Sequence, residues 1–193
     1  MRATQDPAVD GRAQRILVYG VTGSGKSVLA ARVAALRGLE HVAVDDLCWL
    51  PGWVQVLPDE QRRRMAVVCA RDGWVLDSAW GVWSDLALAR ADLVVALDYP
   101  RAVSLARLLR RTVARVVDRR PICNGNTETL AQSFSSESIV AWHFRSFASK
   151  RARIAAWEAD PDLPPVRRLR RPRETAAWLQ QLAAAAPHAQ AVS

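Results

Sequence analysis

The sequence has few cysteines and no long apolar run. Among its 193 residues are three cysteines, Cys48, Cys69 and Cys123, which are odd in number and widely spaced. Such spacing fits neither a disulfide framework nor a paired metal site, so reduced thiols are expected. No apolar stretch approaches the roughly 18 residues of a membrane helix. Residues 1–15 carry no apolar signal-peptide core. We therefore predict a cytoplasmic globular protein without membrane association.

Lysine is almost absent, although the chain is strongly basic. The net charge is +8, and 25 arginines stand against two lysines, Lys26 and Lys150. An arginine-rich surface can bind nucleic acid. Arginines can instead converge on the phosphates of a small substrate, which they bind in bidentate fashion. Genome composition alone can also produce this bias. The absence of a helix-turn-helix or an aromatic RNA-binding signature disfavours nucleic acid as the partner.

Short apolar runs alternate with helical patterns along the chain. This alternation predicts an α/β fold, a three-layer sandwich in which helices cover both faces of a parallel sheet. Ligands of such sheets bind at the carboxyl ends of the strands. The expected strands cover residues 15–20, 41–44, 74–77, 93–97 and 166–169. The expected helices lie between Ser27 and Gly38 and over residues 58–71, 101–117, 139–157 and 174–185.

The segment Gly20-x4-Gly25-Lys26-Ser27 follows the first expected strand and precedes a helix, which is the context of a phosphate-binding loop (P-loop). Its glycines allow successive backbone N–H groups to point at phosphate oxygens. Lys26 is expected to reach the β- and γ-phosphates, and Ser27 to hold Mg²⁺. We therefore predict ATP and Mg²⁺ as cofactors. The predicted nucleotide-binding residues are Val21, Thr22, Gly23, Ser24, Gly25, Lys26, Ser27, Val28 and Arg107.

Two aspartates are expected at the ends of strands beside this loop. Asp77 follows a buried strand, as a Walker-B aspartate does, and is a candidate for Mg²⁺ and substrate contact. Asp45 is the candidate base that orients or deprotonates an acceptor hydroxyl, although its neighbour Asp46 shares the position. Residues 47–57 are expected to form a loop, in which Trp49 and Trp53 wall a pocket for a planar or sugar-like substrate.

The helix over residues 101–117 has an apolar and a basic face. We expect the apolar face to pack in the core and arginines of the other face to close over the transferring phosphoryl group. Arg111 and Arg115 are the predicted catalytic arginines. With the uncharged segment that follows, this gives a lid at about 107–138 in a kinase domain of residues 15–185, between flexible tails at 1–14 and 186–193. The expected core face comprises Ala102, Ala106, Leu109, Val113, Val116 and Val117.

Four motifs together resemble the bacterial adenylate-kinase-like P-loop proteins often labelled DNA topology modulation proteins. They are Gly20-x4-Gly-Lys-Ser27, Asp45-x3-Trp49-x-Pro-Gly-Trp53, Trp74-x-x-Asp77 and Leu97-Asp-x-Pro-Arg101. Asn124-Gly-Asn126-x-Glu128 is also similar to the lid of the actinobacterial branch. The resemblance implies a nucleoside-kinase type of fold with a lid, a five-stranded parallel sheet in the order 2-3-1-4-5, and ATP binding.

The chain departs from that family where the acceptor would bind. It has Asp77-Ser-Ala-Trp80 where the family usually has Asp-Gly-Asn-Tyr, and Ala87 and Thr127 where arginines are common. We therefore predict a kinase that phosphorylates a small-molecule hydroxyl, nucleoside-like or sugar-like. A nucleoside monophosphate kinase of adenylate-kinase type and a nucleic-acid-associated regulatory ATPase are the alternatives. The expected assembly is a monomer or a homodimer.

Overall fold

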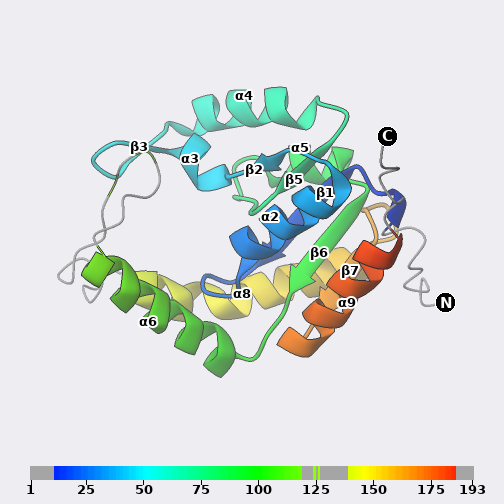
Figure 1. The fold of residues 1–193 in the computed structure, drawn as a ribbon. Helices are drawn as coiled ribbons and strands as arrows, with labels where there is room; N and C mark the ends of the chain where they lie inside the picture. Colours follow the sequence, from blue (N-terminus) through cyan, green and yellow to red (C-terminus); the bar gives the residue numbers. More distant parts are fainter. Residues whose placement is uncertain (1–10, 119–123, 125, 127–138, 186–193) are drawn as a thin grey trace, which may run out of the picture.

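A computed structural model describes residues 11–118, 124, 126 and 139–185, with only the backbone for 116–118 (Figure 1). Its centre is a five-stranded sheet in the order β2-β5-β1-β6-β7, in which every neighbouring pair is parallel. In chain order this is 2-3-1-4-5, as the resemblance implied. The strands are β1 (Arg15–Gly20), β2 (His41–Val42), β5 (Trp74–Leu76), β6 (Leu93–Leu97) and β7 (Val166–Leu169).

Helices cover both faces of this sheet, because side chains of β1 alternate between two cores. Ile16 and Val18 pack with α2 (Lys26–Arg37) and α9 (Pro172–Ala185). Leu17 and Tyr19 belong to the other core. The predicted three-layer sandwich is confirmed. The helices of the second core are α3 (Val44–Cys48), α4 (Pro58–Cys69), α5 (Ser84–Arg90) and α8 (Ile139–Ala159).

The segment after β2 differs from the sequence prediction. The expected strand over 41–44 ends at Val42, and Asp45 and Asp46 lie in the first turn of α3 instead of at a strand end. The cause is Asp77, whose Oδ1 accepts a hydrogen bond of 3.0 Å from the Val44 N–H and so caps the helix. The expected loop 47–57 contains an antiparallel hairpin of β3 (Trp49–Leu50) and β4 (Val54–Gln55).

Helix α6 (Arg101–Asp118) turns a different face inward from the one predicted. Leu109 and Val113 are 37% and 54% exposed. The buried line consists of Ser104, Leu108 and Thr112, which are at most 1% exposed. Two of these three residues are polar because this side of α6 faces the backbone of the P-loop and not an apolar core. As a result, Arg107, Arg111 and Arg115 lie beside the inward stripe and are half-buried.

Packing of the described chain starts before β1. Ala13 is 3% exposed, and the Gln14 carbonyl accepts a hydrogen bond of 2.9 Å from the Trp74 N–H. The predicted tail 1–14 therefore overlaps the folded chain at its last four residues. Residues 1–10 and 186–193, and most of the predicted lid beyond 118, lie outside the described residues. None of the described helices is long and apolar enough to cross a bilayer.

Candidate functional site

The turn between β1 and α2 is built on glycines. Gly23 and Gly25 have φ angles of 80° and 97°, in the left-handed region that L side chains avoid. A Cβ on Gly23 would lie 2.4 Å from the Ser104 carbonyl oxygen of α6. Glycine is therefore required both for the curvature of the loop and for its close approach to α6.

Lys26 closes the P-loop on itself. Its Nζ donates a hydrogen bond of 3.0 Å to the Val21 carbonyl. Burial lowers the pKa of Lys26 to about 7, an effect increased by nearby Lys150 and Arg111 and opposed by Asp45 and Asp77. These five charged groups from separate elements thus share one site. A bound polyphosphate would supply the negative charge that this ammonium lacks.

The hydroxyl of Ser24 is buried inside the loop. Ser24 is fully buried, and its Oγ has no hydrogen-bond partner among the described residues. A buried donor without a partner is unfavourable. Ser27 and Val28, by contrast, are exposed at the start of α2, where a metal ion and a nucleotide could reach them. No group of three or more His, Cys, Asp or Glu side chains able to hold a metal occurs in the described part of the chain.

Among the carboxylates near the P-loop, Asp45 has the largest effect on the pKa of Lys26. Its side chain is accessible to solvent, and partial burial together with Asp77 raises its pKa, against the opposing effect of Lys26 and Arg111. Asp46 has the smallest of the effects on the pKa of Asp45. Asp77 is 6% exposed, and its Oδ2 lies 3.7 Å from His41 Nε2 while its Oδ1 caps α3. The electrostatic effect of Asp45 on Lys26 therefore favours Asp45 over Asp46 as the candidate base.

The three arginines of α6 lie at different distances from this centre. Arg107 Nη1 donates to the Ser24 carbonyl at 3.1 Å, and its guanidinium lies 5.1 Å from the Tyr99 ring centroid. Arg111 acts electrostatically on both Lys26 and Asp45. Arg115 lies one turn further along the same side of the helix. Arg107 thus supports the loop from outside, whereas Arg111 faces the charge cluster.

Three indole rings stand together beside Asp45. The ring centroids of Trp49 and Trp53 are 5.8 Å apart, and those of Trp49 and Trp80 are 5.9 Å apart, both in edge-to-face geometry. All three side chains are half-buried. Trp80 was not among the predicted site residues, although it is one of the three residues of Asp77-Ser-Ala-Trp80 that differ from the Asp-Gly-Asn-Tyr of the similar family. The aromatic wall therefore has contributions from the hairpin and from the segment after β5.

Two asparagines that lie more than 70 residues further along the chain hold this hairpin by hydrogen bonds. Asn126, 4% exposed, accepts from the Trp53 N–H at 2.8 Å and donates to the Leu50 carbonyl at 3.0 Å. Asn124 Nδ2 donates to the carbonyls of Asp46 and Trp49, both at 2.7 Å. Trp53 itself has a φ of 58°, which is unusual for a bulky residue. We call residues 124 and 126 the asparagine clasp.

Removing the buried half of the clasp should loosen the aromatic wall. In Asn126→Ala the Trp53 N–H and the Leu50 carbonyl lose their partner, which costs about 1–3 kcal/mol when such groups stay buried. We expect amide exchange at Trp53 to accelerate at least about fivefold, which corresponds to the lower end of that range. Asn124→Ala is the matched control, because Asn124 is exposed and donates to the carbonyls of Asp46 and Trp49, not to Trp53. Equal exchange in both variants, measured by NMR, would contradict a positioning role for the clasp.

His143 was not predicted as a site residue, yet it contacts the P-loop. It is fully buried on α8, and its Nδ1 lies 3.0 Å from the Thr22 carbonyl oxygen. Because a carbonyl only accepts, Nδ1 carries the proton. Burial lowers the pKa of His143, and nearby Arg101 and Lys26 lower it further. The neutral ring therefore supports the loop backbone. Its distance in sequence from Thr22 explains why no local pattern reveals this contact.

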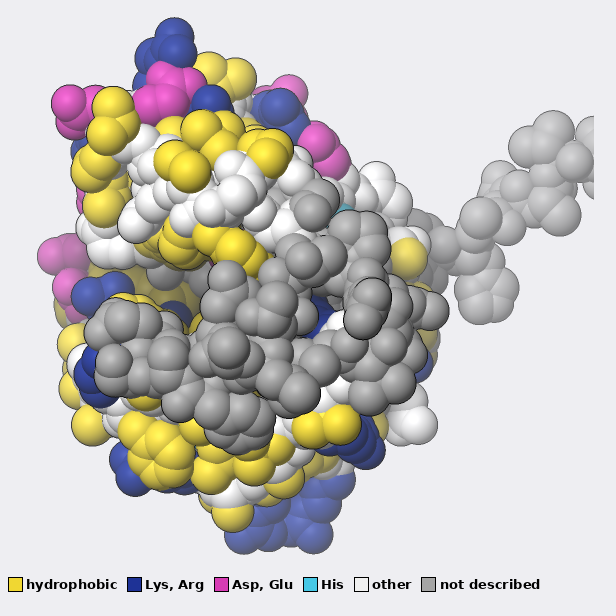
Figure 2. Space-filling model, turned by 90° about the vertical axis from the view of Figure 1, so that its left-hand side faces the viewer, with side chains coloured by type: hydrophobic (Ala, Val, Ile, Leu, Met, Phe, Trp, Pro, Cys, Tyr) yellow, Lys and Arg dark blue, Asp and Glu magenta, His cyan; other side chains and the backbone are white. Residues whose placement is uncertain are grey.

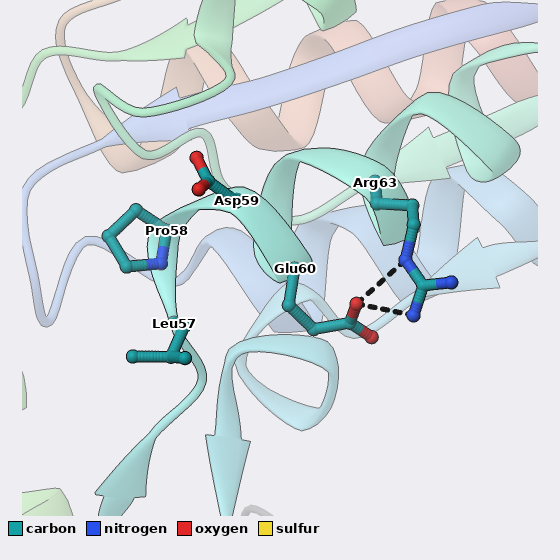
Figure 3. A pocket seen from close by; sticks show the side chains of 5 residues that line it. All are labelled: Leu57, Pro58, Asp59, Glu60 and Arg63. Carbon is teal, nitrogen blue, oxygen red and sulfur yellow. Dashed lines mark hydrogen bonds and ion pairs between the residues drawn. The ribbon is translucent and has the colours of Figure 1, made fainter.

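Charge is distributed unevenly around the site. On α4, Arg63 and Arg64 pair with Glu60, and Arg62 pairs with Asp85. In Figure 2 acidic side chains gather in the upper half, on the side of α4, where basic ones are interspersed with them, whereas the charged side chains at the bottom, on the side of α6, are basic. An open depression of about 540 Å³ lies at the start of α4 and is lined by Leu57, Pro58, Asp59, Glu60 and Arg63. Figure 3 shows these five side chains. The depression contains none of the predicted site residues.

Comparison with known proteins supports the fold. No protein-family model matches the sequence, and no curated protein matches it significantly. Among solved structures, a gluconokinase from Sinorhizobium meliloti 1021 is 19% identical with a TM-score of 0.50, over 89% of this chain and 94% of that one. A shikimate kinase from Acinetobacter baumannii in complex with shikimate is 16% identical with a TM-score of 0.53, over 92% and 95%. These similarities confirm the predicted fold class.

Proposed function

We propose that this protein is an ATP- and Mg²⁺-dependent kinase that transfers the γ-phosphoryl group to a hydroxyl of a small molecule. The observation that carries the proposal is the charge cluster in which Asp45 lies near enough to the P-loop lysine, Lys26, for each to shift the pKa of the other. A nucleotide-binding protein needs the loop alone. Transfer to a hydroxyl also calls for a carboxylate beside the loop that accepts the proton of that hydroxyl. The fold shared with a gluconokinase and a shikimate kinase fits this proposal, as does the resemblance to adenylate-kinase-like P-loop proteins.

The nucleotide would occupy the loop between β1 and α2. Amides from Val21 to Ser27 and the Lys26 ammonium would bind the phosphates, with Val28 and Arg107 beside the nucleotide. The Ser27 hydroxyl would hold Mg²⁺, with Asp77 contributing through water because one of its oxygens already caps α3. The bound ion supplies positive charge that neutralises the phosphate oxygens.

In the proposed step, Asp45 accepts the proton of the acceptor hydroxyl. The oxygen of that hydroxyl bonds to the γ-phosphorus while the bond from the γ-phosphorus to the β-phosphate oxygen breaks, which releases ADP. Arg111, helped by Arg115, stabilises the charge on the transferring group. The raised pKa of Asp45 brings it nearer to the value that suits a general base. Trp49, Trp53 and Trp80 would pack against the ring or carbon skeleton of the acceptor.

The proposed activity can be tested by an acceptor screen. The full chain is incubated with Mg·ATP and nucleosides, nucleoside monophosphates, sugars, sugar acids and other polyols, and acceptor-stimulated ADP release is measured. We expect stimulation by a hydroxyl compound, reduced at least about 100-fold when Asp45→Asn replaces the native protein. Stimulation confined to nucleoside monophosphates would instead support the adenylate-kinase-type alternative. No stimulation by any class would contradict the proposal.

The pH dependence should report on Asp45. Only the ionised carboxylate can accept the proton, so kcat/KM should fall as the pH drops through the pKa of Asp45. Because that pKa is raised, the fall should be centred above about 3.9, the value of an ordinary aspartate. A pH–rate profile with the acceptor from the screen measures this directly. A rate that stays constant down to that ordinary value would argue against Asp45 as the base.

A further inference from the structure

One face of α8 packs against the sheet, and a lysine interrupts it. The buried residues of this helix are His143, Ser146, Phe147, Ile154 and Trp157. Lys150 lies three residues after Phe147 and four before Ile154, which places it on the same inward stripe. It is half-buried there. Lysine is rarely placed on such a stripe unless its charge has a partner.

No carboxylate forms an ion pair with Lys150 among the described residues. Its Nζ lies instead 5.2 Å from the centroid of the Tyr19 ring, at the end of β1. Burial lowers the pKa of Lys150 to about 8, nearby Arg153 lowers it further, and Asp45 opposes the shift. Burying an ammonium group without a paired anion is unfavourable. A lysine in such surroundings is typical of a site where a ligand supplies the negative charge.

Lys150 lies on the acceptor side of the site. Tyr19 packs in the core that also contains α3 and against which Trp49 and Trp80 pack. Helix α2, which begins at the P-loop lysine, belongs to the opposite core. Arg153, one turn along α8, acts on both Lys150 and Tyr19. Lys150 in turn acts on Lys26, so positive groups continue from the P-loop lysine along α8.

We propose that Lys150 binds an anionic group, a carboxylate or a phosphate ester, carried by the acceptor whose hydroxyl faces Asp45. The proposal rests on the kinase function above and narrows its substrate to hydroxyl compounds with a negative charge. Arg153 is placed to help hold the same group. Lys26 and Arg111 remain with the nucleotide phosphates, so the two lysines of the chain serve the two substrates separately.

The presence of only two lysines makes a direct test possible. The full chain is labelled with ¹³Cε-lysine, and the two NMR signals are assigned with Lys26→Met and Lys150→Met. The P-loop is first filled with Mg²⁺ and a non-hydrolysable ATP analogue. D-gluconate and its neutral counterpart D-glucitol are then titrated, followed by inorganic phosphate and sodium chloride at equal ionic strength.

We expect the Lys150 signal to shift saturably with gluconate or phosphate and not with glucitol or chloride. The stronger of the two anions identifies the carboxylate or the phosphate as the preferred group. If the Lys26 signal responds to the nucleotide but the Lys150 signal responds to no anion, this inference is overturned and the kinase proposal stands. A Lys26 signal that ignores the nucleotide contradicts the kinase proposal itself.

Kinetics separate binding by Lys150 from a structural role. With the acceptor from the screen, Lys150→Met should raise the acceptor KM about 10-fold to 100-fold, the effect of losing a charged hydrogen bond. The KM for ATP should stay unchanged, and Lys150→Arg should restore most of the loss. Arg32→Met removes an exposed charge from α2 and serves as the control. An unchanged acceptor KM with a lowered Tm would show a structural lysine and overturn the proposal.

Discussion

Asp45→Asn should lower the acceptor-dependent kcat by about 10²–10⁴-fold, the range attributed to a lost general base. The amide keeps the size of the side chain but cannot accept the hydroxyl proton. Binding of Mg·ATP should be unchanged or tighter, because the substitution removes a negative charge from the surroundings of Lys26. Turnover by ADP release and affinity by fluorescence titration with a nucleotide analogue measure the two effects separately.

Asp46→Asn is the matched control for this prediction. Asp46 is the next residue of α3, it is also exposed, and its carbonyl rather than its carboxylate contacts the asparagine clasp. We expect its kcat to stay within about twofold of the native value, as for a surface substitution away from the reacting atoms. If both variants lose activity equally, or if only Asp46→Asn does, Asp45 is not the base.

Lys26→Met should lower kcat/KM for ATP by about 10²–10³-fold, as expected when one preorganised charge on the transferring group is removed. Thermal stability should not fall with it. The native ammonium is desolvated strongly enough to bring its pKa to about 7, so replacing it with an apolar side chain of similar length removes an unfavourable burial. Steady-state kinetics and thermal melting of the two proteins test both halves of the prediction.

The two halves distinguish a phosphate ligand from a structural lysine. If Lys26 were needed only for its hydrogen bond to the Val21 carbonyl, its substitution would lower the Tm, and activity would fall only in proportion to the unfolded fraction. Native-like melting with severely impaired turnover supports the phosphate role. Full activity in Lys26→Met would remove the basis for placing the nucleotide in this loop.

Sequence alone predicts the elements whose causes are local. The apolar run of β1 and the glycines after it specify a buried strand followed by a tight turn into α2, whatever surrounds them. The same holds for β6, whose five residues are all buried. The alternation of strands and helices then leaves few arrangements for a parallel sheet. The order of its strands came from the family resemblance and not from the residues themselves.

The errors lie where distant residues decide the outcome. Helix α3 starts where it does because Asp77, 33 residues away, caps its first amide. The inward face of α6 contains Ser104 and Thr112 since it meets loop backbone, and a count of apolar residues therefore selects the wrong side. His143 and Lys150 acquire their surroundings only when α8 packs beside β1. Their spacing from Phe147 and Ile154 places both on the inward side of α8, but it does not reveal which groups they meet there.

Calorimetric titration of the intact chain with Mg²⁺ and a non-hydrolysable ATP analogue tests the central claim most directly, because it needs no acceptor. The account predicts a saturable one-to-one heat that is at least about tenfold weaker in affinity for Lys26→Met, equivalent to 1.4 kcal/mol or more. Absence of heat with the native protein, or equal affinity in the variant, would show that residues 20–27 do not bind a nucleoside triphosphate.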